Sequence, residues 1–257
     1  MTQDTEEYLA RKRFYDNVLT VYGRKPVLEV IQAPDITVHR LHLAKSNKPA
    51  SVLDEIIAFA ESKNVDIIYH DKAALSRISK NAKQDQGIAV DIHPKGFTDF
   101  ESFIEEFPAE PFELIALDRI TTPQNLGLII RSVCASPAYG LLLPKKGGAK
   151  LDSLVIKASA GTLFKARIIR CDNLCKSLRQ LRDRGLDVLS LEADAKYDIA
   201  DLDDSRSKVF VLGNESDGVS KEVKDCCNKQ VSITMARGVE SLNVAVAASL
   251  VSFRTVL

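Results

Sequence analysis

Polar side chains follow two apolar runs near the C-terminus, at 209–212 and 231–235, and each run leads into a polar loop that contains glycine. The side chains placed there are Asn214, Glu215, Ser241 and Asn243. Loops that follow neighbouring strands of an open α/β sheet form the crevice in which such sheets bind ligands. These four side chains donate and accept hydrogen bonds and do not form a set of metal ligands. The pattern therefore favours an organic cofactor or substrate.

A third polar loop, 118–132, carries residues suited to phosphate. Pro123 is placed to start a helix, Gly127 allows close backbone approach, and Arg131 offers five donors in a fixed fork. Asn125 and Arg131 are six residues apart, so on a helix they lie about 120° away from a shared face. Two interpretations stay open: part of a ligand site, or a helix with a capping asparagine and an ion-paired arginine.

The elements that would position these loops alternate between strand and helix patterns. In a first unit, helices are expected at 6–18, after the turn at Gly23 and Pro26, at 51–62 and at 72–79, with strands at 38–43, 65–69 and 87–92. From 112 onward, strands are expected at 113–117, 140–143, 166–170, 187–191, 209–212 and 231–233, and helices at 124–134, 152–160, 173–184, 220–227 and from 241 to the end. This alternation predicts a mainly parallel sheet covered on both faces.

Length and composition exclude several classes of protein. A chain of 257 residues, 45% of them hydrophobic, is long enough for roughly two domains. No run approaches the roughly 18 apolar residues of a membrane span, and the acidic start MTQDTEE is unlike a signal peptide, so a soluble cytoplasmic protein is expected. The five cysteines lack the spacing of a zinc site, which predicts reduced thiols and no metal. Surface or structural roles are expected for the four histidines.

Charge is unevenly distributed, although the 35 basic and 35 acidic residues balance. Residues 98–118 contain seven acids and no lysine or arginine, and the part from 98 to 111, with two prolines, is expected to be an exposed acidic connector. Residues 145–184 contain eleven basic and three acidic side chains. This second stretch is either a footprint for a polyanion or a set of solvated helix faces, and charge alone does not decide between them.

Three segments together resemble the signature motifs of the SpoU (TrmH-like) branch of the SPOUT RNA ribose methyltransferases. They are PQNLGLIIRS at 123–132, LGNESDGVS at 212–220 and ITMARGVESLNVAVA at 233–247, in the order and spacing of the family. KASAGTLF at 157–164 is similar to a further family segment. YGRKPVLE at 22–29 and QGIAV at 86–90 resemble the ends of the small substrate-binding domain of many members. The implied division is a substrate-binding domain at 1–97, the connector at 98–111 and a methyltransferase domain at 112–257.

The resemblance implies an α/β fold in which a C-terminal SPOUT-type parallel sheet with a trefoil knot binds S-adenosylmethionine, beside a small N-terminal α/β domain. It implies a homodimer that methylates a ribose 2′-hydroxyl of RNA without a metal. By position, the residues matching the family's cofactor site are Leu212, Gly213, Ile233, Met235, Leu242 and Asn243. Those matching its catalytic site are Arg131, Asn125, Glu215, Ser241 and Asn243. Whether Arg131 acts as a base or as an electrostatic stabiliser stays open.

Two departures from the family pattern accompany this resemblance. Pro137 is expected to end its helix early, and Thr234 stands where the family has proline. Neither removes a functional side chain. The presence of the small domain favours ribosomal RNA, with transfer RNA or a non-catalytic RNA-binding role as alternatives. An oxidoreductase on an ordinary doubly wound sheet is disfavoured because no glycine-rich fingerprint follows an early strand.

Overall fold

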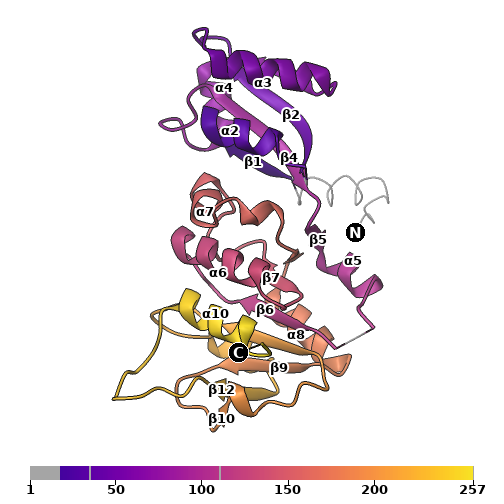
Figure 1. Cartoon of the computed structure of the whole chain (residues 1–257), viewed down its shortest axis with the longest axis vertical. Coiled ribbons are helices and arrows are strands. Elements are labelled where there is room, and N and C mark those ends of the chain that lie inside the picture. Colours follow the sequence, from indigo (N-terminus) through magenta and orange to yellow (C-terminus); the bar gives the residue numbers. More distant parts are fainter. Residues whose placement is uncertain (1–17, 35, 110, 257) are drawn as a thin grey trace, which may run out of the picture. The chain divides into compact units, whose positions relative to one another are not determined.

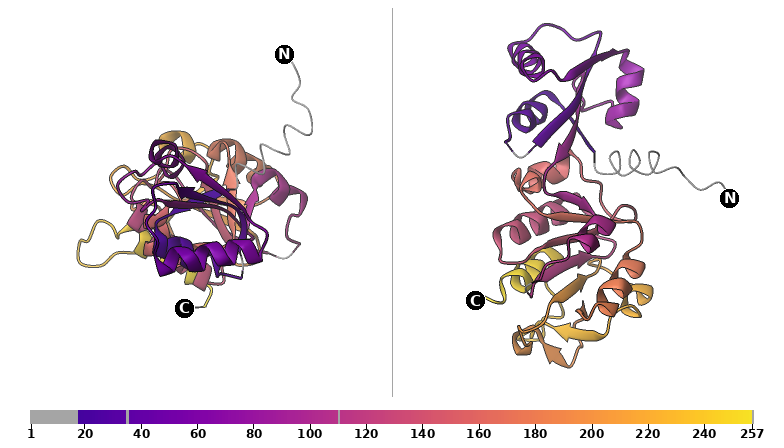
Figure 2. Two further views of the ribbon diagram at one scale, coloured as in Figure 1. Left: turned by 90° about the horizontal axis from the view of Figure 1, so that it is seen from above. Right: turned by 90° about the vertical axis from the view of Figure 1, so that its right-hand side faces the viewer.

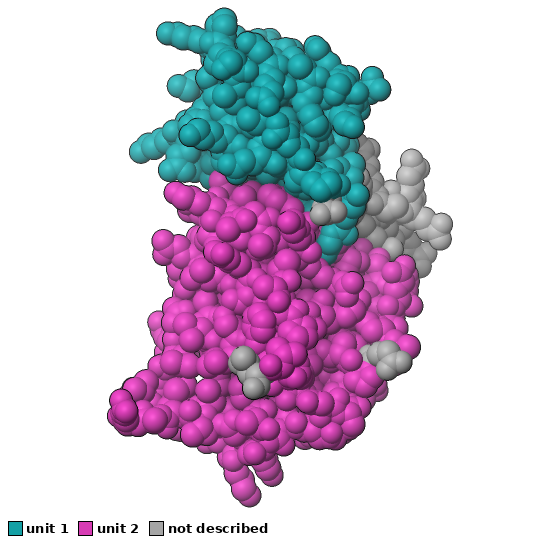
Figure 3. Space-filling view, viewed as in Figure 1, with its two compact units in different colours: residues 1–96 teal, residues 97–257 magenta. Residues whose placement is uncertain are grey.

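The chain divides into two compact units, residues 1–96 and 97–257, which are coloured separately in Figure 3. The structure is a computed structural model and describes residues 18–34, 36–109 and 111–256. The helix expected at 6–18 lies outside the described residues except for its last position. Each unit is described by itself below.

The described part of unit 1 is a four-stranded sheet with three helices (Figure 1). Its elements are β1 (Leu19–Tyr22), α2 (Arg24–Ile31), β2 (Ile36–Ala44), α3 (Ser51–Ser62), β3 (Asp66–His70), α4 (Lys72–Ser79) and β4 (Ile88–Pro94). The strand order is β1-β4-β2-β3, in which only β2 and β3 pair in parallel. The helices at 51–62 and 72–79 begin and end at the expected residues because apolar spacing and the Asp71 cap define them.

A partly buried chain of polar side chains crosses the sheet of unit 1. His42 contacts the Asp91 carboxylate through Nε2 and His70 Nε2 through Nδ1, both at 3.0 Å, and Thr20 Oγ1 donates to Asp91 across 2.6 Å. Burial raises the pKa of Asp91, but the hydrogen bonds from His42 and Thr20 outweigh it and hold the pKa below its usual value. His42 therefore has a structural role, as expected for the histidines.

Unit 2 contains an eight-stranded sheet in which every pairing is parallel. Its first half comprises β5 (Phe97–Asp99), α5 (Phe100–Glu105), β6 (Glu113–Leu117), α6 (Pro123–Ala135), β7 (Gly140–Pro144), α7 (Ser153–Ala158), η1 (Thr162–Phe164) and β8 (Ile168–Cys171). Its second half comprises α8 (Leu174–Asp183), β9 (Asp187–Leu191), β10 (Tyr197–Asp198), η2 (Ile199–Asp201), β11 (Lys208–Leu212), α9 (Lys221–Lys224), β12 (Lys229–Ser232) and α10 (Val244–Phe253). The order β10-β12-β9-β11-β6-β7-β8-β5 confirms the predicted parallel sheet.

Helices cover both faces of this sheet, as the right-hand view of Figure 2 shows. On one face, α5, α8 and α9 bury Phe103, Leu178 and Val223 against alternate residues of the strands, among them Leu114 and Val209. On the other face, α6 lies between α7 and α10, and α10 also contacts β6 and β11. The near-continuous apolar runs of the central strands follow from this double coverage.

The expectation of an exposed connector at 98–111 is wrong over its first half. Residues 97–99 form β5, which pairs with β8 at the edge of the sheet, and residues 100–105 form α5. Phe100 and Phe103 are buried in the core of unit 2. The acidic composition of this stretch led to the expectation of an exposed segment. Burial of its two phenylalanines contributes more to folding than exposure of its acidic side chains does.

Other details of unit 2 also differ from expectation. The last helix begins at Val244 instead of Ser241, because the side chain of Asn243 caps it by accepting a hydrogen bond from the Ala245 N–H at 2.9 Å. The short β10 at the sheet edge was not expected, since two residues carry no periodicity. Pro137 follows the end of α6 at Ala135 closely, as predicted.

We expect Arg254→Met to lower the free energy of unfolding by about 3 kcal/mol, measured by urea denaturation. Arg254 comes directly after α10, and its guanidinium binds the carboxylates of Glu113 on β6 and of Asp204. Only 6% of the Arg254 side chain and 14% of the Glu113 side chain are exposed, so the substitution leaves a nearly buried carboxylate without this partner. Arg179→Met, on an exposed face of α8, should change the stability by less than about 0.5 kcal/mol. Equal losses in the two variants would contradict this assignment.

Candidate functional site

A pocket of about 360 Å³ lies at the carboxyl ends of three adjacent strands, β12, β9 and β11. Its lining comes from four places: the end of β9 and the two residues after it (191–193), the end of β11 and its loop (212–216 and Gly218), the segment after β12 (Ile233 and Met235), and the residues before α10 and in its first turn (240–242, Val244 and Ala247). This is the edge of a parallel sheet at which open α/β folds bind ligands. The segments that line the pocket are separate in sequence and meet only in the fold.

Seven of the ten residues predicted for the site line this pocket. They are Leu212, Gly213, Glu215, Ile233, Met235, Ser241 and Leu242. Asn125 and Asn243 are connected to it by hydrogen bonds, and Arg131 is not part of the lining. The lining is apolar along its strand ends and polar at Glu215 and Ser241, a combination typical of small-molecule sites.

The loops after β6 and β11 are fastened to each other by backbone and side-chain contacts. The buried carboxylate of Asp118 accepts a hydrogen bond from the Ser220 N–H at 2.7 Å. Arg119, whose φ of 56° is left-handed, donates to the Gly218 carbonyl at 3.2 Å, and its own carbonyl accepts from Asn214 Nδ2 at 3.1 Å. These contacts fix the pocket wall relative to the start of α6.

Gly213 is needed for the fold of its own loop. A Cβ on this residue would lie 2.0 Å from the Gly218 carbonyl carbon and 2.1 Å from the Val219 nitrogen. Both neighbours are backbone atoms that cannot rotate away, so even alanine would displace the loop. The resemblance places Gly213 at the cofactor site, and the fold of the loop itself also requires a glycine here.

A chain of three polar side chains joins α6, the β11 loop and α10. Asn125 Nδ2 donates to Glu215 Oε1, and Asn243 Nδ2 donates to Asn125 Oδ1 at 3.3 Å. Further towards the C-terminal ends of the two helices, Ser249 and Ser132 are hydrogen-bonded at 2.7 Å. The helices α6 and α10 therefore run side by side in the same direction. The helix packing thus brings together residues that lie as far as 118 positions apart in the sequence.

Arg131 lies on a different face of α6. It is exposed, and among the described residues it makes neither a hydrogen bond nor an ion pair. Asn125 and Ser132 face α10, and the helical period turns Arg131 away from Asn125, as the spacing of six residues predicts. Its neighbour one turn earlier, Leu128, is 45% exposed.

Glu192 also lines the pocket, although the sequence did not predict it as a site residue. It follows β9, one carboxylate oxygen accepts from Lys224 Nζ at 2.7 Å, and the other is buried with no hydrogen-bond partner among the described residues. A buried, unpaired carboxylate oxygen is costly unless a ligand supplies a donor. The only available signal was its position after a strand, which becomes informative once β9 is known to neighbour β11.

Other chemistry finds less support in the described part of the chain. No group of three or more histidine, cysteine or acidic side chains there is arranged to hold a metal ion. The five cysteines are free thiols, and burial raises the pKa of Cys171 to about 11, which leaves little reactive thiolate at neutral pH. No described helix has the length and apolar character needed to span a membrane.

Comparison with known proteins gives two family matches. Residues 112–253 match the SpoU rRNA Methylase family, and residues 20–98 match the RNA 2′-O ribose methyltransferase substrate binding family. A protein of Mycolicibacterium vanbaalenii described as an uncharacterized tRNA/rRNA methyltransferase is 34% identical over 243 residues, which cover 94% of this chain and 77% of that protein. One of Mycobacterium avium with the same description is 36% identical over 233 residues, covering 90% and 75%.

Solved structures of similar fold include two with a bound cofactor. An AdoMet-bound rRNA methyltransferase from Sinorhizobium meliloti superposes with a TM-score of 0.66 and 22% identity, over 95% of this chain and 89% of that one. A SpoU methyltransferase from Streptomyces viridochromogenes in complex with AdoMet gives the same TM-score and identity, over 95% and 91%. These structures confirm the expected α/β fold with a parallel sheet and an N-terminal substrate-binding domain. With the family match over more than half of the residues, they lead to one conclusion: the chain belongs to the SpoU rRNA methylase family.

Proposed function

We propose that this protein transfers a methyl group from S-adenosylmethionine to a ribose 2′-hydroxyl of RNA, and that the RNA is ribosomal. The observation that carries the proposal is the pocket at the ends of β9, β11 and β12, where seven predicted site residues meet beside the Asn125, Glu215 and Asn243 chain. Membership of the SpoU family supports methyl transfer, and the match of residues 20–98 supports an RNA ribose substrate. An RNA substrate of this kind implies a cytoplasmic protein.

The residues of the pocket fit this cofactor. A volume of about 360 Å³ lies within the range of small-molecule sites, and Leu212, Ile233 and Leu242 provide apolar contacts for a flat base. Glu192, Glu215 and Glu240 line the same space and provide negative charge opposite a cationic ligand. The unpaired oxygen of Glu192 can accept a hydrogen bond from a ligand hydroxyl or ammonium group.

The polar chain at the pocket rim is suited to orienting a ribose. When bound, S-adenosylmethionine supplies an electrophilic methyl group whose transfer leaves a neutral thioether. Asn125 and Asn243 hold Glu215 in a fixed position, from which its carboxylate can accept the proton of a substrate hydroxyl. Alignment of the nucleophile contributes much of the rate in such a transfer. Arg131 is turned away from Asn125 in this structure, so the role that we propose for it, stabilisation of the developing alkoxide, rests on the family resemblance and on its chemistry, because a guanidinium is not an ordinary base.

We also infer a homodimer and the knotted C-terminus that the resemblance implies. Leu128 on α6 and Val246 on α10 are 45% and 48% exposed on two helices that pack against each other, and exposed apolar side chains grouped in this way favour a protein interface. The chain passes through β12 near the sheet edge and returns to place α10 over the central strands β6 and β11, as a knotted segment requires.

Calorimetry should detect binding of S-adenosylmethionine or S-adenosylhomocysteine to the purified protein without added metal. Glu192→Gln should weaken binding, because the amide places a donor where the pocket supplies only an acceptor. Asp172→Asn is the matched control and should bind normally, because this carboxylate also pairs with a lysine but is 74% exposed and lies outside the pocket lining. A folded protein that binds neither compound would contradict the proposed cofactor.

Gly213→Ala should abolish cofactor binding and also loosen residues 213–220, measured by hydrogen–deuterium exchange. The added Cβ would overlap backbone atoms of Gly218 and Val219, so the loop must move. Gly147→Ala provides a comparison, since nothing lies within 4 Å of a Cβ there, although its positive φ adds some strain. Loss of binding with an unchanged exchange pattern would place the effect in the ligand contact alone.

Arg131→Ala should reduce methyl transfer by about 10² or more while cofactor affinity stays nearly constant, as for loss of one preorganised charge. Arg131→Lys should restore little, because a point charge does not reproduce the guanidinium fork. The readout is methylation of RNA from cells that lack the gene, with the modified nucleotide mapped by mass spectrometry. Modification of transfer RNA instead would correct the substrate, and normal turnover in Arg131→Ala would remove this residue from the mechanism.

Sedimentation at micromolar concentration should report about twice the chain mass of 28.3 kDa. Val246→Glu should shift the protein toward the monomer, because it places a charge on the exposed apolar face of α10. Val239→Glu is the matched control, since Val239 is similarly exposed (52%) but lies outside both helices. A wild-type monomer would overturn the dimer proposal.

A further inference from the structure

A second hollow lies at the opposite edge of the unit 2 sheet. Its volume is about 580 Å³. Its lining includes Phe112, Tyr139 and Arg167, which directly precede β6, β7 and β8. The strands are about five residues long, which separates this amino-terminal edge from the carboxyl-terminal pocket by roughly 15 Å at about 3.3 Å per residue. The hollow is therefore distinct from the proposed cofactor site.

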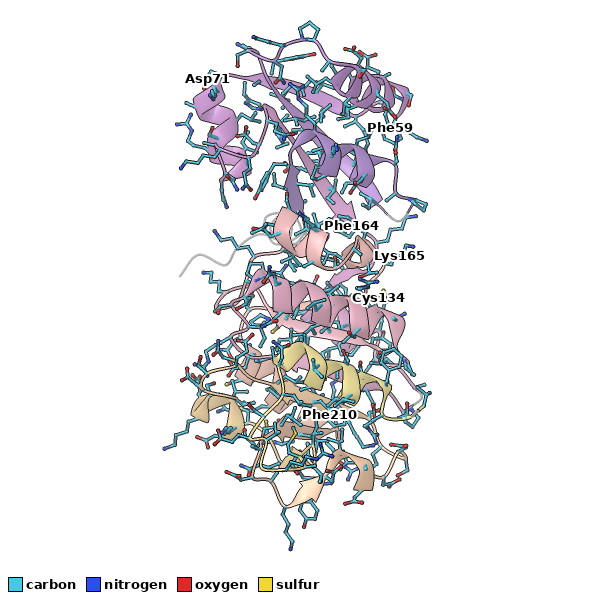
Figure 4. All side chains as sticks on the ribbon, turned by 60° about the vertical axis from the view of Figure 1, so that its left-hand side comes forward. Phe59, Asp71, Cys134, Phe164, Lys165 and Phe210 are labelled. Carbon is cyan, nitrogen blue, oxygen red and sulfur yellow. The ribbon has the colours of Figure 1, made fainter. Side chains whose placement is uncertain are left out.

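The described lining of this hollow is positively charged. It contains Lys165 and Arg167 and no acidic side chain. Both are exposed, and neither forms an ion pair with a described carboxylate. Figure 4 shows Lys165 close to Cys134, a half-buried thiol of the same lining. Two cations without an ion-pair partner among the described residues, around a cavity of this size, favour an anionic ligand.

Arg167 is held in place before any ligand binds. Its guanidinium carbon lies 4.0 Å from the ring centre of Tyr139, and its carbonyl accepts from the Leu141 N–H at 3.0 Å. A Cβ at Gly140 would lie 2.5 Å from that carbonyl oxygen, so glycine permits this close approach. Because the side chain is already ordered by the ring, less conformational entropy is lost when it binds an anion.

The ring beneath Arg167 belongs to a cluster of aromatic residues that also holds a second arginine. Tyr139 contacts Phe112 at 5.2 Å between ring centres, Phe112 contacts Phe107 at 5.3 Å, and Arg184 lies over Phe107 at 5.4 Å. Cations thus occur at both ends of the row of rings. This spacing fits an extended polyanion better than one small ion, and backbone phosphates are the groups that such side chains contact in nucleic acids.

We propose that Lys165 and Arg167 form a phosphate site for the RNA backbone at this edge of the sheet. The inference rests on the proposed function and extends it, since the strand bound here is several nucleotides away from the ribose at the cofactor pocket. The site contributes to RNA affinity and leaves the chemical step unchanged. Base identity has no part in it, because phosphate contacts position a strand without reading its sequence.

The test uses the full chain and a labelled single-stranded RNA of about 20 nucleotides and mixed sequence, with affinity measured by fluorescence anisotropy at increasing salt. Lys165→Met combined with Arg167→Met should flatten the dependence of log affinity on log salt by about 1.4, from about 0.7 for each lost phosphate contact. Lys165→Arg combined with Arg167→Lys should retain most of the slope. Calorimetry with S-adenosylhomocysteine should give the wild-type affinity in both variants.

The matched control is Lys196→Met combined with Arg179→Met. Lys196 is an exposed cation 5.7 Å from the ring of Tyr197, and Arg179 is exposed on α8, so this variant removes the same two charges outside the hollow. The inference would be overturned if the Lys165→Met/Arg167→Met variant showed the same salt dependence as the control variant. It would also be overturned if this variant lost affinity for inorganic phosphate or AMP but bound RNA as the wild-type protein does. A wild-type protein that binds no RNA would overturn the proposed function as well.

A second readout uses Cys134 as a reporter. RNA bound in the hollow should slow alkylation of Cys134, followed by mass spectrometry, relative to the same protein without RNA. Burial raises the pKa of the Cys134 thiol, so the reaction is run at mildly alkaline pH. Equal alkylation rates with and without RNA would contradict the proposed location.

Discussion

The hydrogen bond between the buried Asp118 carboxylate and the Ser220 N–H is the contact on which the rest of the site depends. It joins the loop that leads into α6 to the loop that follows β11, and Arg119 strengthens the same junction through Gly218 and Asn214. Without these contacts, the two loops could move independently, although their strands are paired in the sheet. The pocket wall and the start of α6 therefore form one rigid frame, which is the condition for orienting two reactants.

Pairs of helices complete that frame. α6 and α10 run in the same direction, with Asn125 facing Asn243 at one end and Ser132 facing Ser249 further along. Gly127 makes the opposite side of α6 equally close-packed, since a Cβ there would lie 2.4 Å from the Cβ of Ala158 on α7. The glycine between Asn125 and Arg131 thus permits the close backbone approach that the sequence indicated, and the element that approaches it is α7.

Much of the fold could be predicted from the sequence, because apolar periodicity and caps determine the long elements locally. The helix at 51–62, for example, needs only its own spacing of Leu53, Ile56 and Ala60. The site was partly predictable as well, since Gly213, Ile233 and Leu242 follow strands or precede a helix. The roles assigned to them remain predictions.

The rest depends on contacts between distant residues. Glu192 becomes a pocket residue only because β9 pairs with β11, and the pairing of strands is not encoded near residue 192. The cations at 145–184 look uniform in sequence, yet Lys145 is paired with Asp172 while Arg167 rests on an aromatic ring. The stretch that forms β5 and α5 is rich in acidic residues and was therefore expected to be exposed, but its two phenylalanines are buried in the core.

The edge strand β5 has a consequence for exchanging domains between proteins. It pairs with β8 and is followed by Phe100 and Phe103, which fill the core beside α8. A methyltransferase fragment cut at residue 112, where the family match begins, would expose the hydrogen-bonding groups of β8 and a hydrophobic gap, which is a template for aggregation. A chimera that replaces the first unit should therefore be joined before Phe97, so that the edge strand β5 stays with the second unit.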